Sequence, residues 1–482
     1  MQAIDISNRA AATEIADMPA SELAVQIGAK RISPVQAVEA ALRRVQQRSE
    51  LNAFITLCSD HARQEAKSAE AAIMRGDPVG PLCGIPFSVK DLTNTEGVRT
   101  TQGSALMADA VPASDAVAVA RARAAGAILI GKTTTPEFGH KAFTEGPLFG
   151  RTLNPWSRDH TCGGSSGGAA VAVAAGMGAL ALGSDGGGSI RIPAACCGIA
   201  GFKATLGGIP NLQAPDLFGA NSYVGPMARS VADVRLMFQA IRGADRRDPY
   251  GQKTTQWGSP RDDQPLRIGW LPKCGNILDP EVERVTLEAV MQLQDLGCEV
   301  ETIELDLVSL EPHFLVLLRS MLHARLGRQR REHPDLLDTT LIATIDAGEG
   351  LTAADLWQAQ FARTGCFAKV QEFLGRFDLI VSPTLSAPAL PVGLDPLGEI
   401  EIAGRSAGTI RGAWYPYTFP FNLTGHPAIS LPCGLTSSGL PVGLQLVGRW
   451  YEDDVVLDLA EKLEAVLAFD GTPALSANQQ EV

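Results

Sequence analysis

Gly163-Gly164-Ser165-Ser166-Gly167-Gly168 opens the stretch around which this chain is organised, and Gly183-Ser184-Asp185-Gly186-Gly187-Gly188-Ser189-Ile190-Arg191-Ile192-Pro193 closes it. The run between the two segments is rich in Ala, Gly and Val and carries no charged residue. Glycine at this density supplies backbone conformations that other residues avoid. Successive N–H groups in such turns form a concave anion site. A serine in each turn is therefore a candidate nucleophile beside an oxyanion hole.

Three separated elements of the sequence resemble the signature of the amidase signature hydrolases. Ser165 and Ser189 lie 24 residues apart, within a pattern that meets the family signature from Gly163 to Ala194. Upstream, Gly84-Ile85-Pro86-Phe87-Ser88-Val89-Lys90-Asp91 is similar to the family's lysine motif, and its lysine precedes Ser165 by 75 residues. The resemblance extends from about Ala37 to the mid-450s. It predicts hydrolysis of carbon–nitrogen bonds through an acyl-enzyme.

The resemblance also implies a role for each polar residue of the two turns. Ser189 would be the nucleophile, Ser165 the proton relay, and Lys90 the base and then the acid. The peptide bond Gly164–Ser165 is expected to be cis. The oxyanion hole would consist of the backbone N–H groups of Gly186, Gly187, Gly188 and Ser189. Among supporting residues, Asp185 and Arg191 are expected to pair across the second turn, and Ser166 to hydrogen-bond near Lys90.

The chemistry of amide cleavage places a demand on Lys90. Serine is a weak nucleophile without a base, and a lysine at its ordinary pKa of about 10.4 is charged at neutral pH. Burial lowers a lysine pKa because desolvation disfavours the ammonium. Lys90 ends the apolar run Ile85–Val89, which reads as a short buried strand. Asp91 would oppose deprotonation unless its side chain points away, as neighbours on a strand do.

Helical and strand-like segments alternate along the chain, which predicts an α/β fold. We expect a large mixed, mostly parallel twisted sheet with helices on both faces, as in the amidase signature fold. One domain would span 1–482, with an N-terminal helical part at about 1–75 and a core at about 76–470. The segment at about 310–371 is expected to be a variable, mostly helical insertion.

Composition restricts the partners and the compartment. The formal charge of −12 over 482 residues disfavours a nucleic-acid partner. Nine scattered cysteines, with no CxxC pair, indicate reduced thiols and a cytoplasmic protein. Met1 to Met18 lacks the apolar region of a secretion signal. The uncharged stretch Thr161–Ser184 is better explained by a buried helix than by a membrane span. We expect no metal or organic cofactor and no membrane partner, and a homodimer remains open.

Two other motifs match active-site patterns without their structural context. Gly126-Ala127-Ile128-Leu129-Ile130-Gly131-Lys132-Thr133 fits the P-loop pattern, but its inner residues favour a core strand and no helix follows. Gly163–Gly167 fits the nucleophile elbow of α/β-hydrolase esterases, with Ser165 as the nucleophile. That mechanism needs a downstream histidine, and His426 is the tolerable candidate. This esterase mechanism would leave Lys90 and the second serine turn without a role.

Substrate preference lies outside these motifs. We expect pocket residues in four segments, at Phe138-Gly139-His140, Gly207–Phe218, Leu315–Leu326 and Trp414-Tyr415-Pro416-Tyr417-Thr418-Phe419. The individual substrate-binding candidates are Phe138, His140, Trp414 and Tyr417. The aromatic segment favours small, largely apolar amides, anilides or carbamates. The alternative is the glutamine-hydrolysing subunit of a tRNA-dependent amidotransferase, which usually carries an acidic residue near this segment and a polar one where Ile192 stands.

Overall fold

The computed structural model describes residues 15–219, 221–251, 264–469, 471 and 473. Most of the Met1–Met18 segment and part of the predicted N-terminal helical region thus lie outside the described residues. One sheet of 11 strands runs through the molecule in the order β1-β3-β2-β6-β8-β7-β14-β15-β11-β9-β10. The strands of this sheet are β1 Phe54–Leu57, β2 Pro86–Lys90, β3 Ile128–Thr133, β6 Leu180–Asp185, β7 Ala200–Lys203, β8 Tyr223–Ala228, β9 Arg267–Trp270, β10 Glu299–Thr302, β11 Leu379–Pro383, β14 Ala428–Leu435 and β15 Pro441–Gly448. Two small hairpins lie outside it, β4 Glu145–Gly146 with β5 Gly150–Arg151, and β12 Glu399–Ile402 with β13 Arg405–Thr409.

The sheet is mixed, as the sequence predicts, but the expectation that it is mostly parallel is wrong. Four neighbouring pairs are parallel, namely β3–β2, β2–β6, β11–β9 and β9–β10. The other six pairs are antiparallel and include all the central ones, from β6 through β8, β7 and β14 to β15 and β11. Parallel strand–helix–strand units therefore make the two flanks of the sheet.

Helices cover the sheet on both faces. The α-helices that lie wholly within the described residues are α2 Ala20–Gly28, α3 Pro34–Gln47, α4 Ser59–Arg75, α5 Val117–Ala124, α6 Gly167–Ala174, α7 Arg191–Cys197, α8 Val231–Ile241, α9 Pro280–Asp295, α10 Glu311–Glu332, α11 Thr339–Asp346, α12 Ala353–Arg376, α13 Ile410–Trp414, α14 Pro420–Thr424 and α15 Asp453–Leu467. On β6, Leu180 and Leu182 join the core shared with α5, α8, α9 and α15, whereas Ala181 faces the core of α6 and α7. This alternation is the period of a strand buried on both sides.

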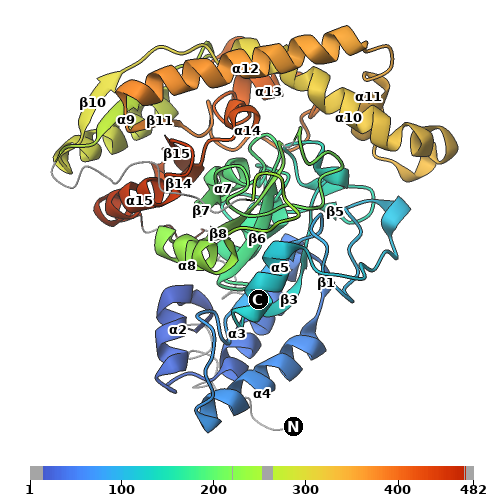
Figure 1. The fold of residues 1–482 in the computed structure, drawn as a ribbon, viewed down its shortest axis with the longest axis vertical. Helices are drawn as coiled ribbons and strands as arrows, with labels where there is room; N and C mark the ends of the chain where they lie inside the picture. The colour runs from blue at the N-terminus through green and yellow to red at the C-terminus, as the bar shows by residue number, and fades with distance from the viewer. Residues whose placement is uncertain (1–14, 220, 252–263, 470, 472, 474–482) are drawn as a thin grey trace.

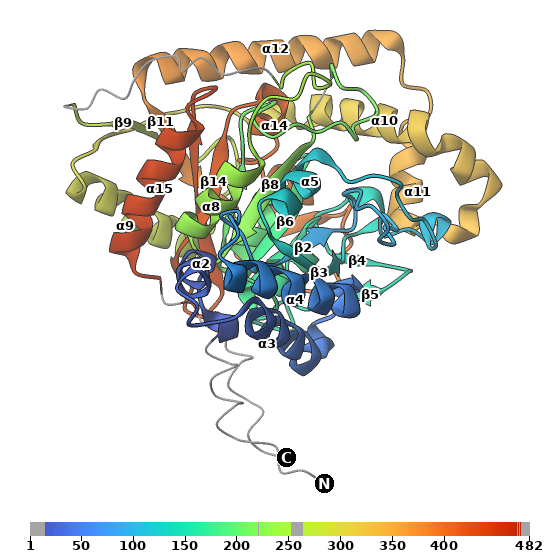
Figure 2. The same cartoon turned by 60° about the horizontal axis from the view of Figure 1, so that its bottom comes forward.

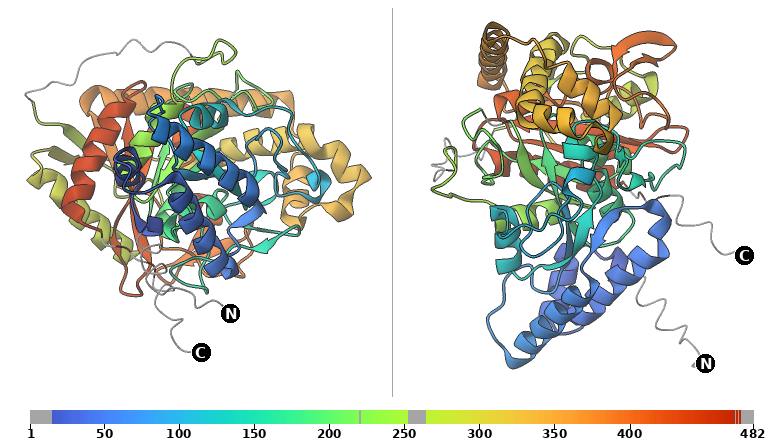
Figure 3. Two further views of the ribbon diagram at one scale, coloured as in Figure 1. Left: turned by 90° about the horizontal axis from the view of Figure 1, so that it is seen from below. Right: turned by 90° about the vertical axis from the view of Figure 1, so that its right-hand side faces the viewer.

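The ends of the molecule are helical. Figures 1 and 3 show α2, α3 and α4 together at one end and α10, α11 and α12 at the opposite end. The predicted helical segment at about 310–371 corresponds to α10, α11 and most of α12. Figure 2 shows α15 between α8 and α9 along the sheet. The division of the chain into domains stays a prediction.

Some helices begin with a capping side chain and others do not. Ser33 forms a capping box with Gln36 at the start of α3, as its position before Pro34 predicts. By contrast, α5 begins at Val117, and its N-cap Ala116 offers no side-chain acceptor. The short elements α7, β7, β8, α8 and β9 were not predicted.

Candidate active site

Lys90 lies at the carboxyl end of β2, beside the carboxyl end of the parallel strand β6. Every residue of β2 is buried, and Phe87 and Val89 pack into the core on one face of the sheet. Lys90 is therefore turned to the other face, against the two serine turns. Ligands in α/β proteins commonly bind at the carboxyl ends of parallel strands.

The amine of Lys90 contacts three oxygen atoms of the glycine-rich turns. Its Nζ lies 2.8 Å from Ser165 Oγ, 2.9 Å from Ser166 Oγ and 3.3 Å from the carbonyl oxygen of Ser184. Lys90 is fully buried. Burial lowers the pKa of Lys90 well below its ordinary value, and the negative charge of Asp185 opposes this only in part.

The side chain of Asp91 points away from the amine, as expected for neighbours on a strand. Its Oδ2 accepts hydrogen bonds from the N–H groups of Thr101, at 3.0 Å, and Gly103, at 3.4 Å. The carboxylate thus stabilises the loop after β2. It is not among the groups that shift the pKa of Lys90.

The first serine turn places Ser165 directly before α6. The Gly164–Ser165 peptide bond is cis, which confirms the prediction. Ser165 is almost fully buried, and Gly139 approaches it so closely that a Cβ there would lie 3.1 Å from Ser165 Oγ. Gly139 also has a φ of +69°, so a side chain there would be both crowded and strained. The Ser166 N–H donates to the carbonyl of Ser189 at 3.0 Å, which joins the two turns.

The second turn presents a partly exposed Ser189 after three glycines. The N–H groups of Gly186, Gly187 and Ser189 have no acceptor within the described part of the chain. Gly188 differs, because its N–H donates to Asp185 Oδ1 at 2.5 Å. The expectation that Gly188 contributes to the oxyanion hole is therefore corrected: its N–H is already used inside the turn. Thr418 also packs on Gly188, since a Cβ there would lie 2.3 Å from Thr418 Oγ1.

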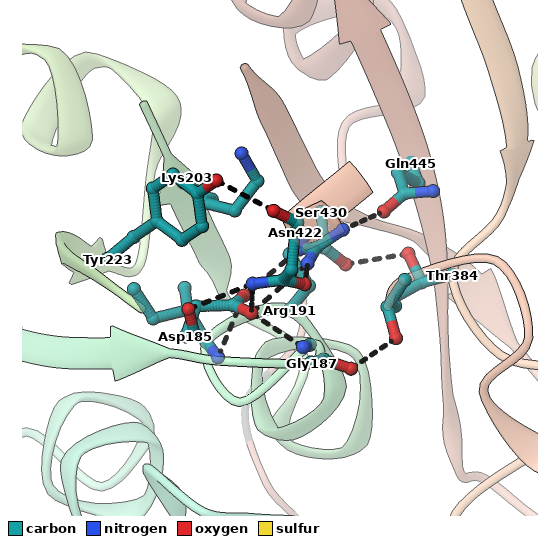
Figure 4. Close-up of polar contacts among 12 residues, drawn as sticks. Asp185, Gly187, Arg191, Lys203, Tyr223, Thr384, Asn422, Ser430 and Gln445 are labelled. Atoms are coloured by element: carbon teal, nitrogen blue, oxygen red, sulfur yellow. Dashed lines mark hydrogen bonds and ion pairs between the residues drawn. The ribbon is translucent and has the colours of Figure 1, made fainter. Parts of the chain in front are cut away.

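A buried ion pair holds this turn from beneath. Arg191 Nε donates to Asp185 Oδ2 at 3.0 Å, and both side chains are inaccessible to solvent, as Figure 4 shows in close-up. Burial alone would raise the pKa of Asp185, but the Arg191 guanidinium outweighs it and the pKa lies below its ordinary value. The predicted pairing of these two residues is confirmed.

Two residues from the last quarter of the described chain complete the ion pair. Asn422, on α14, donates from Nδ2 to Asp185 Oδ1 at 2.8 Å and accepts from Arg191 at 2.6 Å. Gln445, on β15, accepts from Arg191 at 2.8 Å (Figure 4). Sequence reasoning missed both, and neither Phe421-Asn422-Leu423 nor Leu444-Gln445-Leu446 carries a local signal.

Three of the four substrate-binding candidates are part of the interior. Trp414 and Tyr417 have no accessible surface, and their polar atoms donate to the carbonyl oxygens of Ala387 and Pro272. The His140 side chain is also inaccessible and hydrogen-bonds Glu137 and Thr340. These three residues pack the core and do not line a pocket in this structure. Phe138 is half-buried beside Gly139 and stays a candidate.

Two residues outside the four candidates pack against the second turn at Gly187. A Cβ on Gly187 would lie 2.9 Å from the ring of Phe314 and 3.4 Å from Arg411 Nη1. Phe314 belongs to α10 and Arg411 to α13. Phe314 lies just outside the predicted Leu315–Leu326 segment, and Arg411 was not predicted.

Neither of the two alternative motifs forms the site that its pattern suggests. Residues Ile128–Thr133 form strand β3, and Lys132 is buried with Nζ bonded to Thr95 Oγ1 at 2.8 Å, so no P-loop exists there. His426 is buried, and its Nδ1 lies 2.8 Å from Thr424 Oγ1 rather than bonded to a serine of either turn. Burial lowers the pKa of His426 to about 3. A histidine-based elbow is not assembled around Ser165.

The sequence matches a known protein family over most of its length. The sequence model of the Amidase family matches residues 36–457. The chain belongs to the amidase family, the amidase signature enzymes, and is an amide hydrolase. No helix among the described residues is long and apolar enough to cross a membrane.

The similarity to individual proteins and to solved structures covers nearly the whole chain. An acylamidase of Rhodococcus erythropolis is 35% identical, covering 93% of this chain and 95% of its own. The A subunit of the glutamyl-tRNA(Gln) amidotransferase of Picosynechococcus is 32% identical over 92% of this chain and 95% of its own. The crystal structure of a bacterial aryl acylamidase superposes with a TM-score of 0.88 at 29% identity, covering 96% of this chain and 99% of that one. A 6-aminohexanoate cyclic dimer hydrolase has a TM-score of 0.84 at 28% identity, covering 95% and 99%.

Proposed function

We propose that the protein cleaves small amides through an acyl-enzyme, with Ser189 as nucleophile, Ser165 as relay and Lys90 as base and acid. The observation that carries the proposal is the set of contacts around the Lys90 amine. Ser166 Oγ lies 3.0 Å from the Ser184 carbonyl, to which it donates its only hydrogen. Ser166 must then accept from Lys90, and the Ser184 carbonyl accepts a second Lys90 hydrogen.

A neutral amine has two hydrogens and one lone pair. With both hydrogens directed at Ser166 and Ser184, the lone pair faces Ser165 Oγ. The lowered pKa of Lys90 supports the neutral form at physiological pH. In this state Lys90 accepts the Ser165 proton while Ser165 accepts the proton of Ser189.

The reaction then proceeds in two steps, acylation of Ser189 and hydrolysis of the acyl-enzyme. Ser189 Oγ attacks the substrate carbonyl, and the N–H groups of Gly186, Gly187 and Ser189 receive the negative charge on its oxygen. The proton returns from Lys90 through Ser165 to the leaving nitrogen, the carbon–nitrogen bond breaks, and the acyl group stays on Ser189. Water repeats the sequence on the ester and releases the acid. Each oxyanion donor contributes about 3 kcal/mol to lowering the barrier.

For the substrate we propose small, largely apolar amides, anilides or carbamates. The acylamidase and aryl acylamidase relatives support this class. The buried Trp414 and Tyr417 do not support it, and Phe314, which packs beside Gly187, is also buried. The second candidate is the glutamine-hydrolysing subunit of an amidotransferase, which the amidotransferase relatives favour. Tyr415, Pro416 and Thr418 provide no carboxylate in this segment for a substrate amino group.

Turnover of para-nitroacetanilide by Ser189→Ala tests the proposed nucleophile. We expect the variant to lose turnover and to lose covalent labelling by a fluorophosphonate, while Ser157→Ala, a serine outside both turns, keeps both. Labelling of Ser189→Ala at another serine would overturn the assignment. Hydrolysis by the purified chain alone would support the free-standing amidase; activity only with added partner subunits and tRNA would favour the second candidate.

A further inference from the structure

Arg411 lies beside the second serine turn and has no ionic partner among the described residues. Its guanidinium carbon lies 4.8 Å from the centre of the Phe314 ring and 5.3 Å from that of Tyr415. Across the described residues, no carboxylate oxygen lies within 4.0 Å of its nitrogens, and it donates no hydrogen bond. Contacts with aromatic faces use the positive charge but leave the N–H donors unpaired.

The helix that carries Arg411 is anchored at its first turn. Thr409 caps α13 by accepting from the Gly412 N–H at 3.1 Å, and its hydroxyl donates to Glu311 at the start of α10. Glu311 is the nearby acid, but that hydrogen bond holds it on the Thr409 side, outside ion-pair distance of the guanidinium. Arg411 itself is half-buried, and its guanidinium lies over both the Phe314 and the Tyr415 ring.

The guanidinium is placed beside the expected reaction centre. Arg411 Nη1 would lie 3.4 Å from a Cβ on Gly187, two residues before Ser189. The Gly187 N–H is one of the three donors without an acceptor in the described part of the chain. The guanidinium therefore lies beside one of the three donors that we propose for the substrate carbonyl oxygen.

We propose that Arg411 is a specificity-determining residue that binds an anionic group, such as a carboxylate, on the amide substrate. This inference rests on the proposed function and narrows it to amides that carry a negative charge within reach of Arg411. Arginine suits this role because its planar fork matches a carboxylate with two parallel hydrogen bonds.

Matched substrate pairs test the proposal in two series. The acyl series compares the para-nitroanilides of butyrate and of succinate, which carries one free carboxylate. The amine series compares para-acetamidotoluene with para-acetamidobenzoate. In the wild type we expect kcat/KM for the anionic member of one series to exceed that for the neutral member by about 10- to 100-fold. The series that shows the preference identifies the side of the amide that faces Arg411.

Variants then assign the preference to the guanidinium. Arg411→Gln should abolish the preference for the anionic member. It should change kcat/KM for the neutral member less than about threefold, because the neutral substrate has no charge for the guanidinium to bind. Arg411→Lys should keep part of the preference, since it retains charge but loses the fork. Arg405→Gln, an exposed arginine on the neighbouring β13, should leave it unchanged.

Two results would overturn the inference. One is a wild type without anion preference in either series. The other is an Arg411→Gln variant, folded by circular dichroism, in which neutral and anionic substrates lose activity equally, since that indicates a general role at the oxyanion or in packing. Either result leaves Ser189-dependent cleavage of the neutral anilide in place. Failure of the proposed function itself would instead remove hydrolysis of both members of each pair.

Discussion

Asn422 donates two hydrogen bonds to Asp185 across 237 residues of sequence, one to its carbonyl oxygen at 2.9 Å and one to Oδ1 at 2.8 Å. Asp185 in turn accepts from the Gly188 N–H, so Asn422 and the second turn are connected through one carboxylate. The orientation of the three remaining N–H donors at Gly186, Gly187 and Ser189 thus depends on contacts made far from the turn. This gives the turn a rigid support before any substrate arrives.

Replacing Lys90 with methionine should stop hydrolysis at neutral pH. Methionine fills a similar volume but can neither accept the Ser165 proton nor donate it to the leaving nitrogen. Loss of a general base typically costs about 10²- to 10⁴-fold in rate. We expect kcat for para-nitroacetanilide to fall at least that far. Undiminished turnover in a folded variant would exclude Lys90 from the proton path, and Lys67→Met on the surface of α4 is the control.

The pH dependence of kcat/KM should follow the lowered pKa of Lys90. The active form is the neutral amine, so activity rises as pH increases through that pKa and then stays level. Because burial lowers this pKa well below the ordinary value, the plateau should begin well before pH about 10.4. The measurement is kcat/KM at constant ionic strength from acidic to alkaline pH. A tenfold increase per pH unit continuing up to pH about 10 would show that Lys90 is charged in the free enzyme.

Replacing His426 with glutamine should leave catalysis largely intact. Its Nδ1 contacts Thr424, and its main role is to pack against Phe367, with ring centres 5.5 Å apart. We expect kcat/KM within about tenfold of the wild type, well short of the 10²- to 10⁴-fold loss of a general base. A larger loss without unfolding would favour the esterase-like elbow.

The same variant should change how stability depends on pH. The folded pKa of His426 is lowered to about 3, against about 6.5 when unfolded, so below pH about 6.5 the unfolded chain binds a proton that the folded chain does not. His426 therefore makes the free energy of unfolding fall as pH decreases from about 6.5 toward 3, by at most about 1.4 kcal/mol per pH unit. Urea titrations at pH 7 and 5 should show a smaller fall for His426→Gln than for the wild type. An equal fall would mean that His426 accepts a proton in the folded state.

Asp185→Asn should destabilise the fold strongly. The change leaves Arg191 buried without its counter-ion, and removing one partner of a buried pair costs about 3–5 kcal/mol. We expect a loss of this size in urea unfolding, together with loss of activity. The surface pair Arg328–Glu332 is the matched control, since Glu332→Gln there should cost less than about 1 kcal/mol. Equal losses in the two variants would contradict the structural role of Asp185.

The sequence predicts the two serine turns well because their signal is local. Lys90, Ser165 and Ser189 sit in motifs that carry their own glycines and spacing, and the structure brings Lys90 to Ser165 and joins the two turns. Asn422 and Gln445 could not be found in this way, because their hydrogen bonds to Arg191 cross 231 and 254 residues. In the sequence, a buried Asn or Gln in an apolar segment gives no indication of which distant group its side chain will hydrogen-bond.

Aromatic composition and strand order set further limits. Trp414 and Tyr417 look like pocket residues in sequence, but an indole or phenol that reaches a carbonyl packs equally well inside a core. The parallel pairing of β2 with β3 follows from the helix α5 between them. The antiparallel centre depends on β7 and β8, and β7 contains only Ala200–Lys203, too few residues to show an alternation.

The support beneath the second turn has a consequence for how the enzyme is made. All residues of the proposed proton path are translated before residue 190, yet the side chains that clamp Asp185 and Arg191 arrive at positions 422 and 445. A nascent chain on the ribosome therefore carries the proposed nucleophile and relay serine before the two side chains that hold Asp185 and Arg191 have been made. Premature termination before α14 would yield a fragment that keeps every residue of the proposed proton path and lacks the support beneath the proposed oxyanion hole.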